Sequence, residues 1–334
     1  MIVVTGGAGF IGSNLVAALN QRGVHDLVVC DTLGTGDKWR NLAKHEIADL
    51  IAPKDLARYL LNRFRTNDSW GRIEAVFHLG AVSSTTETDA DLILRQNFVF
   101  SLMLWRLCSE HRVRLIYASS AATYGDGGAG FDDDHTIEGL ARLRPLNAYG
   151  WSKHLFDRRA ARLARNPDTR PPQCVGLKFF NVYGPNEYHK GAMQSVIAQK
   201  FPLARDGEPV TLFKSLHADY PDGGQMRDFV YVRDCVDVML WLYEHSEVNG
   251  LFNMGTGRAR SFDDLAAALF AALGTEGEVA YIDLPESIRG RYQYFTQADM
   301  NRLRNAGYMG TFASLEEGVA DYVRSYLMAE DPYR

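Results

Sequence analysis

Residues 2–12 read Ile2-Val3-Val4-Thr5-Gly6-Gly7-Ala8-Gly9-Phe10-Ile11-Gly12, a β-branched run followed by a glycine-rich turn. Glycine at positions 6, 9 and 12 permits a tight turn and a close approach of the backbone to a pyrophosphate. The next stretch predicts a helix, whose N-terminal amides and positive dipole end would face the same anion. Asp31 comes 19 residues after Gly12, close to the spacing at which an acidic residue binds the adenosine ribose. The stretch therefore predicts a dinucleotide site.

The first half of the chain alternates short apolar runs with helix-length segments. We expect strands at 2–5, 27–31, 75–78, 114–119 and 174–180, and helices at 13–22, 54–65 and 91–111. Nearly continuous apolar strands separated by helices are typical of a parallel sheet covered on both faces. In the less regular second half we expect helices at 234–245, 262–273 and 315–327 and short strands at 250–253 and 280–282. The glycine- and acid-rich residues 126–134 are expected to form a surface turn. The predicted fold class is α/β, a Rossmann-type doubly wound parallel sheet followed by a smaller α/β region.

Composition excludes several functional classes. The 334 residues are 46% apolar and 23% charged, which argues against disorder, and the net charge of −5 gives no general attraction to nucleic acid or an anionic membrane. No apolar run approaches a membrane span of about 20 residues, and the first residues lack the basic start of a signal peptide. The four cysteines are widely spaced and the nine histidines form no metal-binding pattern. We therefore expect no metal and reduced cysteines in a cytoplasmic protein.

A second pattern indicates proton-transfer chemistry. Tyr149 and Lys153 are four residues apart, so on a helix they share one face. The pKa of a free tyrosine is about 10, and a nearby ammonium and an oxidised nicotinamide ring both favour the phenolate. We expect a lowered pKa to make Tyr149 a usable acid/base group. Ser120 ends an apolar run and would place its hydroxyl at the carboxyl end of a strand, in reach of the same substrate oxygen.

These motifs together resemble the extended short-chain dehydrogenase/reductase superfamily, which acts largely on nucleotide sugars. The resemblance implies a larger Rossmann domain for the cofactor and a smaller C-terminal domain for the substrate. The expected division is 1–181, completed by about 228–257, for the first domain. Residues 182–227 and 258–334 then form the second domain.

A narrower resemblance covers nearly the whole chain. It rests on the strings 5–14, Ser83-Ser-Thr-Thr-Glu87, 117–125, 180–185, His189-Lys-Gly191, 227–232, Gly290-Arg-Tyr-Gln293 and Phe295-Thr-Gln-Ala-Asp299. These resemble the ADP-glyceromanno-heptose 6-epimerase family. The resemblance implies inversion of C6″ of ADP-D-glycero-D-manno-heptose through a transient C6″ ketone, in the biosynthesis of the lipopolysaccharide inner core. It also implies bound NADP, an ADP-heptose substrate and a homo-oligomer, often a pentamer.

The resemblance also implies roles for single residues. Tyr149, with Lys153 and Ser120, matches one catalytic acid/base group, and Lys190 matches the other; by its own pattern Lys190 is a solvated loop lysine. Cofactor contacts are matched by Gly6, Gly9, Phe10, Ile11, Gly12, Asp31, Thr32, Lys38, Leu79, Gly80, Ala81, Val82, Ser83, Gln96, Lys153, Val182 and Lys190. Substrate contacts are matched by Asn181, Ala192, Gln199, Phe213, Lys214, Ser215, Leu216, Arg227 and Tyr292.

Some positions depart from the family pattern and some alternatives stay open. Leu79 replaces a glutamate, Ala192 a serine and Gln199 a histidine, and residues 216–225 form a longer segment. Asp31 alone favours NAD, whereas the family preference favours NADP with Lys38 as partner of the 2′-phosphate. The alternatives to the heptose reaction are a UDP-sugar 4-epimerase and a non-catalytic cofactor-binding protein on the same fold. A 4,6-dehydratase fits less well, because Ala121-Ala122 follows Ser120 where that branch carries an Asp-Glu pair.

Overall fold

A seven-stranded sheet forms the centre of this computed structural model, which describes residues 1–65, 72–289 and 292–334. The strand order is β10-β6-β5-β4-β1-β2-β3, and every neighbouring pair is parallel. The strands are β1 (Ile2–Thr5), β2 (Leu27–Cys30), β3 (Asp49–Ile51), β4 (Ala75–His78), β5 (Arg114–Ser120), β6 (Cys174–Phe179) and β10 (Gly250–Met254). Between β1 and β4 the order changes direction, which is where ligands bind in doubly wound sheets.

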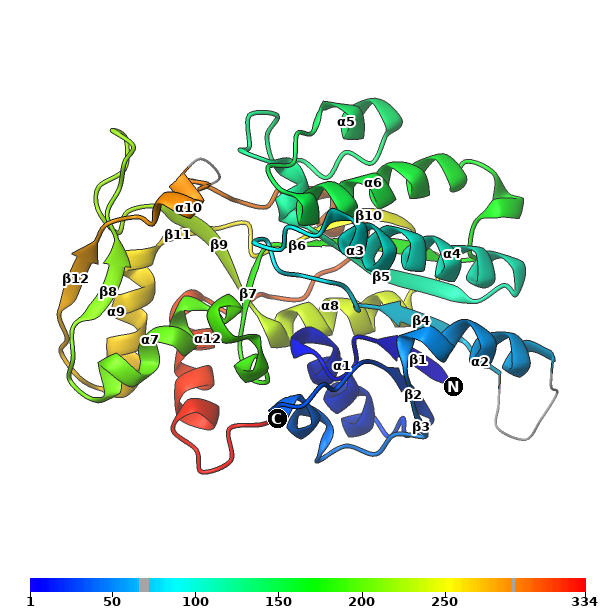
Figure 1. The fold of residues 1–334 in the computed structure, drawn as a ribbon, viewed down its shortest axis with the longest axis horizontal. Helices are drawn as coiled ribbons and strands as arrows, with labels where there is room; N and C mark the ends of the chain where they lie inside the picture. Colours follow the sequence, from blue (N-terminus) through cyan, green and yellow to red (C-terminus); the bar gives the residue numbers. More distant parts are fainter. Residues whose placement is uncertain (66–71, 290–291) are drawn as a thin grey trace.

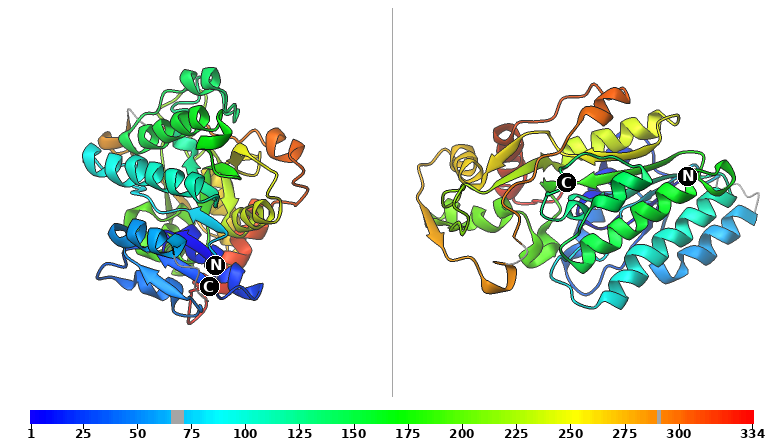
Figure 2. Two further views of the ribbon diagram at one scale, coloured as in Figure 1. Left: turned by 90° about the vertical axis from the view of Figure 1, so that its right-hand side faces the viewer. Right: turned by 90° about the horizontal axis from the view of Figure 1, so that it is seen from above.

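Helices cover both faces of this sheet, as the end-on view of Figure 2 shows. α1 and α8 pack together on one face, and α4 and α6 lie against β5 on the other. The helices are α1 (Phe10–Gln21), α2 (Pro53–Arg65), α3 (Ala90–Ile93), α4 (Phe100–Glu110), α5 (Ile137–Arg142), α6 (Ala148–Leu163), α8 (Val232–Glu244) and α11 (Asn301–Asn305). Shorter turns of helix are η1 (Asp37–Leu42), η2 (Leu94–Val99), η3 (Ala121–Tyr124), η4 (Pro167–Thr169) and η5 (Tyr188–Met193). The expected α/β fold class is confirmed.

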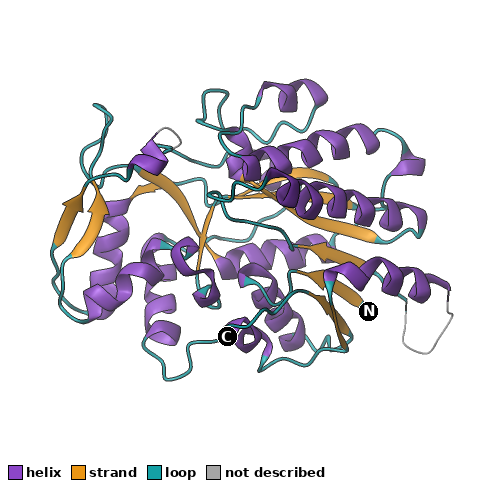
Figure 3. Ribbon diagram, viewed as in Figure 1, coloured by secondary structure: helices purple, strands orange, loops and turns teal. Residues whose placement is uncertain are grey.

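A second group of elements lies to one side of the sheet, at the left of Figures 1 and 3. It contains β7 (Asn181–Tyr183), β8 (Val210–Phe213), β9 (Met226–Tyr231), β11 (Ala259–Ser261), β12 (Val279–Ile282), α7 (Val196–Arg205), α9 (Phe262–Leu273), α10 (Glu286–Arg289), α12 (Leu315–Tyr322) and η6 (Val323–Leu327). These elements enclose a hydrophobic core of their own, which includes Phe201, Leu269 and Val319. Phe10, from the glycine-rich turn, also belongs to this core. The division of the chain at 181, 227 and 257 stays a prediction.

Several expected elements need correction. The single helix expected at 91–111 is α3, the π-helical turn η2 and α4, and residues 323–327 also form a π-helical turn after α12. The strands β3, β7, β8, β9 and β11 were not expected. Most of residues 126–134 form the expected surface turn, but two of them reach inward. Phe131 packs edge-on against Tyr124, and the buried Asp133 accepts the Asn253 N–H at 2.8 Å.

Within the described parts of the chain, no helix is both long enough and apolar enough to cross a membrane.

Candidate active site

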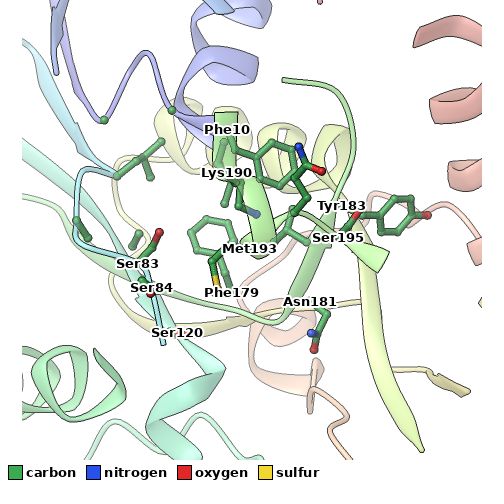
Figure 4. Close-up of a pocket in the computed structure, with 18 of the residues that line it drawn as sticks. Phe10, Ser83, Ser84, Ser120, Phe179, Asn181, Tyr183, Lys190, Met193 and Ser195 are labelled. Atoms are coloured by element: carbon green, nitrogen blue, oxygen red, sulfur yellow. The ribbon is translucent and has the colours of Figure 1, made fainter. Parts of the chain in front are cut away.

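A cavity of about 770 Å³ opens at the carboxyl ends of β1, β4, β5 and β6. Predicted site residues that line it are Gly6, Gly9, Phe10, Ile11, Gly12, Asp31, Lys38, Leu79, Gly80, Ala81, Val82, Ser83, Ser120, Tyr149, Lys153, Asn181, Val182, Lys190 and Ala192. Parallel strands bring these residues together from distant parts of the sequence because their carboxyl ends meet at one edge. Figure 4 shows Phe10 and Lys190 side by side in this cavity, with Ser83, Ser84 and Ser120 away from them.

Two positions of the glycine-rich turn have no room for a Cβ atom. Gly6 has φ +67°, and a Cβ on it would lie 2.6 Å from the Gly80 nitrogen. A Cβ on Gly12 would lie 2.1 Å from the Gly6 carbonyl oxygen. Helix α1 begins immediately after this turn, and its N-cap Gly9 has no side chain to occupy the first amides. The turn therefore leaves a bare backbone cradle at a helix N-terminus, which suits the pyrophosphate of a dinucleotide.

Asp31 and Lys38 form an ion pair at the end of β2. The Asp31 carboxylate accepts hydrogen bonds from the Ala8 N–H at 2.9 Å, the Thr32 N–H at 2.7 Å and Lys38 Nζ at 2.5 Å. Lys38 also donates to the Thr32 carbonyl at 3.1 Å. This places a neutralised carboxylate and a cation together where the adenosine ribose of a dinucleotide would lie.

Asn97 holds the segment 79–83 and was missed by sequence reasoning. Its side chain is buried, accepts the Val82 N–H and donates to the Val82 carbonyl, both at 2.9 Å. It also donates to Ser152 Oγ on α6 at 3.0 Å. Asn97 lies in the π-helical turn η2, and such turns are frequent at functional sites. Nothing in the spacing of the sequence distinguished this asparagine from its neighbours.

Tyr149 and Lys153 lie on one face of α6, as their spacing predicted. Asn147 caps this helix by accepting the Gly150 N–H at 2.8 Å. Lys153 donates to the Ala118 carbonyl at 2.8 Å, and burial lowers its pKa to about 8. Burial raises the pKa of Tyr149, against the smaller lowering effect of its hydrogen bond with Ser120. In the chain by itself, desolvation of the phenolate outweighs its polar contacts. The lowered pKa, which we expect with the oxidised nicotinamide ring beside Tyr149, stays a prediction.

A buried charge network lies one helical turn beyond Lys153. Asp157 and Lys178 are fully buried, with 3.4 Å between Oδ2 and Nζ. Asp157 also accepts hydrogen bonds from Ser119 Oγ at 2.6 Å and from the Tyr117 hydroxyl at 3.3 Å. Burial raises the pKa of Asp157, and Lys178 acts in the opposite direction. Asp157 was not predicted as a site residue. The four-residue spacing of positions 149, 153 and 157 along one helix face could have indicated it.

Lys190 enters the same cavity from η5. Its Nζ lies 4.8 Å from the centre of the Phe10 ring and 3.6 Å from Glu187 Oε2. The next residue, Gly191, has φ +53°, a conformation that residues with a Cβ rarely adopt. His189, beside it, contacts Asn41 at 3.2 Å, and burial lowers its pKa to about 4. Glu187 and His189 were not predicted as site residues.

Arg227 and Tyr292 line a second cavity, of about 560 Å³, together with Thr85, Asn147 and Gln293. The Arg227 guanidinium lies 5.2 Å from the centre of the Tyr292 ring. It donates to the Met226 carbonyl at 2.8 Å and also to the Gln293 carbonyl. Ser84 lines the first cavity and the next residue, Thr85, lines the second, so the two cavities lie close to each other at this segment.

Other predicted site residues do not line either cavity. These are Thr32, Gln96, Gln199, Phe213, Lys214, Ser215 and Leu216. Gln199 instead donates to the Ala192 carbonyl at 3.2 Å and the Gln194 carbonyl at 2.7 Å. Gly290 and Arg291 of the string 290–293 lie outside the described residues. Among the residues that are described, no group of three histidine, cysteine or acidic side chains is arranged to hold a metal ion.

Comparison with known proteins gives consistent matches. Residues 2–255 match the model of the NAD dependent epimerase/dehydratase family. The chain is 50% identical over 333 residues to ADP-L-glycero-D-manno-heptose-6-epimerase of Nitratidesulfovibrio vulgaris, covering 100% of both chains. It is 47% identical over 339 residues to the protein of the same name from Fusobacterium nucleatum, again covering 100% of both. The crystal structure of the Helicobacter pylori protein of that name superposes with a TM-score of 0.77 at 29% identity, covering 97% of this chain and 95% of that one.

Proposed function

The chain belongs to the NAD dependent epimerase/dehydratase family and, within it, to the ADP-L-glycero-D-manno-heptose 6-epimerases, and we propose that it interconverts the two C6″ epimers of ADP-glyceromanno-heptose. This reaction supplies the L-glycero heptose of the lipopolysaccharide inner core. The observation that carries the proposal is that Tyr149 and Lys190 reach one cavity from different elements, beside the glycine-rich turn. An epimerase needs proton-transfer groups for a hydroxyl that points to different sides in its two epimers.

The chain's own residues would divide the work as follows. When bound, the nicotinamide cofactor supplies a reversible hydride acceptor for C6″. Tyr149 holds or removes the hydroxyl proton of one epimer, with Ser120 hydrogen-bonded beside it, and Lys190 does the same for the other. After one turnover the group that removed the proton holds one proton more and the group that returned it one fewer, so proton exchange with solvent must restore both groups before the next turnover.

The nucleotide part of the substrate suits the second cavity. The Arg227 guanidinium is a permanent, forked cation that matches a diphosphate. Its position beside Tyr292 and along the segment that borders the first cavity would leave the heptose directed toward Tyr149 and Lys190. We retain Asn181 and Ala192, which line the first cavity, as proposed substrate contacts. The residues 213–216 and Gln199 stay predictions.

NADP is the cofactor that we propose within the nicotinamide class. Lys38, Ala8 and Thr32 already donate to Asp31, so its charge is neutralised and its oxygens are engaged. A 2′-phosphate would then meet less repulsion, and Lys38 would provide its positive partner. We expect Lys38→Ala to reduce the preference for NADP over NAD by about 10–100-fold, the loss of one charge-assisted contact. Titration of cofactor-stripped protein with each dinucleotide measures this ratio, and an unchanged ratio would reject the role of Lys38.

We further propose a homo-oligomer, a pentamer as the family resemblance implies, acting in the cytoplasm. The four free, buried cysteines are consistent with a reducing compartment. Sedimentation equilibrium of the purified protein, with and without cofactor, tests the oligomeric state. A monomer at micromolar concentration would reject this part of the proposal.

The reaction itself is tested by proton NMR of ADP-D-glycero-D-manno-heptose with purified protein and no added cofactor. Appearance of the L-glycero epimer supports the proposal and shows that cofactor is retained through purification. No change after addition of NADP and then NAD rejects it, and UDP-hexose 4-epimerisation is then the reaction to test. No turnover of any sugar nucleotide by folded, cofactor-loaded protein would favour the non-catalytic alternative.

Lys190→Met tests the second acid/base group. The substitution keeps an unbranched side chain over the Phe10 ring but removes the proton-transfer atom, so we expect kcat to fall by about 10²–10⁴-fold with cofactor still bound. Full activity of this variant would reject the two-group mechanism while leaving the heptose assignment intact.

A further inference from the structure

Glu187 is a completely buried carboxylate at the start of η5. Its oxygens accept hydrogen bonds from the Ser195 N–H at 2.5 Å, Ser195 Oγ at 2.7 Å and the Tyr322 hydroxyl at 3.2 Å. A carboxylate without water is costly unless donors and an opposite charge surround it. In the part of the chain that the structure describes, the one cation within ion-pair distance is Lys190, at 3.6 Å. Lys190 is therefore the charge that compensates the buried Glu187 carboxylate.

Lys190 is held on two sides. Glu187 lies three residues before it, and the Phe10 ring lies 4.8 Å from its Nζ. In Figure 4, Lys190 lies against Phe10 with Ser195, the anchor of Glu187, also bordering the cavity. Burial lowers the pKa of Lys190, and the Glu187 charge and hydrogen bond act in the opposite direction. The carboxylate thus lies beside the ammonium and opposes the effect of burial on the Lys190 pKa.

The titratable side chains that border this pair, Tyr188, Tyr322 and His189, carry no charge at neutral pH. Burial raises the pKa of the Tyr188 and Tyr322 phenols far above their ordinary value, so both stay protonated. Burial lowers the pKa of His189 to about 4, so its ring is neutral above that pH. Lys38 and Asp31, which also face His189, are paired with each other. A change at Glu187 should therefore reach Lys190 without compensation by a neighbouring charge.

We propose that Glu187 is a positioning residue for the reaction, holding Lys190 over Phe10 and keeping its ammonium protonated until a proton must be transferred. The carboxylate also joins η5 to the N-terminus of α7 through Ser195 and to α12 through Tyr322. The position of the proton-transfer group is in this way set by the second core of the molecule. The proposal rests on the proposed function, in which Lys190 is the second acid/base group.

The pH dependence of kcat in both directions of epimerisation tests this role. Glu187→Gln keeps the shape but removes the charge, so the pKa of Lys190 falls. The limb of the profile that depends on Lys190 should move to lower pH by about 1–3 units, the effect of one opposite charge at this distance. In the direction of epimerisation in which Lys190 acts as an acid, this is the alkaline limb of the profile. In the direction in which Lys190 acts as a base, it is the acidic limb. Glu187→Asp keeps the charge but shortens the side chain, so kcat should fall without this shift.

Two controls distinguish an effect on the position of Lys190 from a folding defect. Tyr322→Phe removes one hydrogen bond to Glu187 but no charge, so the limbs of its pH profile should stay at their wild-type pH. Thermal unfolding and the amount of retained cofactor identify any variant that has not folded. If Glu187→Gln does not fold, the kcat profile of Glu187→Asp still tests the role of the charged side chain. Wild-type profiles in Glu187→Gln, with Lys190→Met inactive, would overturn the role of Glu187 alone. Full activity of Lys190→Met would instead overturn the proposed function of Lys190.

Discussion

The two proposed proton-transfer groups are held in different ways. Tyr149 stands on α6, a regular helix of 16 residues whose cap, Asn147, is two positions before it. Lys190 stands on η5, six residues interrupted by the left-handed Gly191. The helix fixes Tyr149 relative to Lys153 by its own hydrogen bonds. The η5 segment depends on Glu187, Phe10 and the elements behind them.

The two regions also differ in where their compensating charges come from. Along α6, Lys153 and Asp157 lie on the same helix face as Tyr149, and Asp157 pairs with Lys178 from β6. In η5, Glu187 and Lys190 are neighbours in sequence, but the contacts that keep Glu187 buried come from α7 and α12. A regular helix and an irregular segment held by tertiary contacts therefore face the same cavity. The following variants test this comparison.

Asp157→Ala should have the largest effect, because it leaves Lys178 buried without its partner. Loss of one member of a buried ion pair costs about 3–5 kcal/mol of stability. Urea unfolding followed by circular dichroism measures this loss. The double variant Asp157→Ala/Lys178→Met should recover part of it, since neither charge is then left alone. A single-variant loss below about 1 kcal/mol would mean that water or another group compensates Lys178.

Tyr149→Phe should lower activity without lowering stability. It removes one hydroxyl at the cavity and leaves the α6 backbone unchanged, so stability should hardly change. We expect kcat to fall by about 10²–10⁴-fold, the usual contribution of a positioned acid/base group. Proton NMR of the turnover measures this, and the absorbance of cofactor released on denaturation checks the binding site. Activity close to wild type would remove Tyr149 from the mechanism.

His154, on α6, should make stability depend on pH. Burial, with smaller effects of Lys178 and nearby arginines, lowers its pKa to about 4, below the value of about 6.5 in an unfolded chain. The unfolded state then binds more protons between these values, so stability is lost as the pH falls through this window.

The effect of His154 should be roughly 1–3 kcal/mol between about pH 7 and pH 4. His154→Gln should flatten this part of the curve of unfolding free energy against pH. His189→Gln, in the η5 region, should flatten it less because the His189 side chain is more exposed. Equal slopes in wild type and His154→Gln would contradict the assignment to His154.

Gly191→Ala should have the smallest effect on stability, about 1 kcal/mol from backbone strain alone. A Cβ at Gly191 meets nothing within 4 Å, and the same holds for Gly207, which also has positive φ but lies outside the cavity. Gly207→Ala is therefore a control for a Cβ added at positive φ in open space. We expect similar stability losses in thermal unfolding, with a clear fall in kcat for Gly191→Ala only. Equal activity in both variants would mean that the η5 backbone does not position Lys190.

Sequence reasoning identified the parts of the site that depend on local spacing. The glycines of the first turn, Asp31, Ser120 and the pair Tyr149 and Lys153 were found from strand ends and helix periodicity, and all of them line one cavity. Lys190 was found through family resemblance, because a lysine in an irregular segment has no periodic signal. Glu187 and Asn97 were missed because their importance comes from burial and from partners elsewhere in the chain.

The sequence by itself determined the α/β fold, the glycine turn and the face shared by Tyr149 and Lys153. These features follow from steric limits and from helix and strand periods, which act between residues a few positions apart. The tertiary structure alone decided that burial raises the pKa of Tyr149 and that Glu187 compensates Lys190. Proton affinities depend on desolvation and on charges brought close by folding, and neither quantity is set by neighbours in sequence.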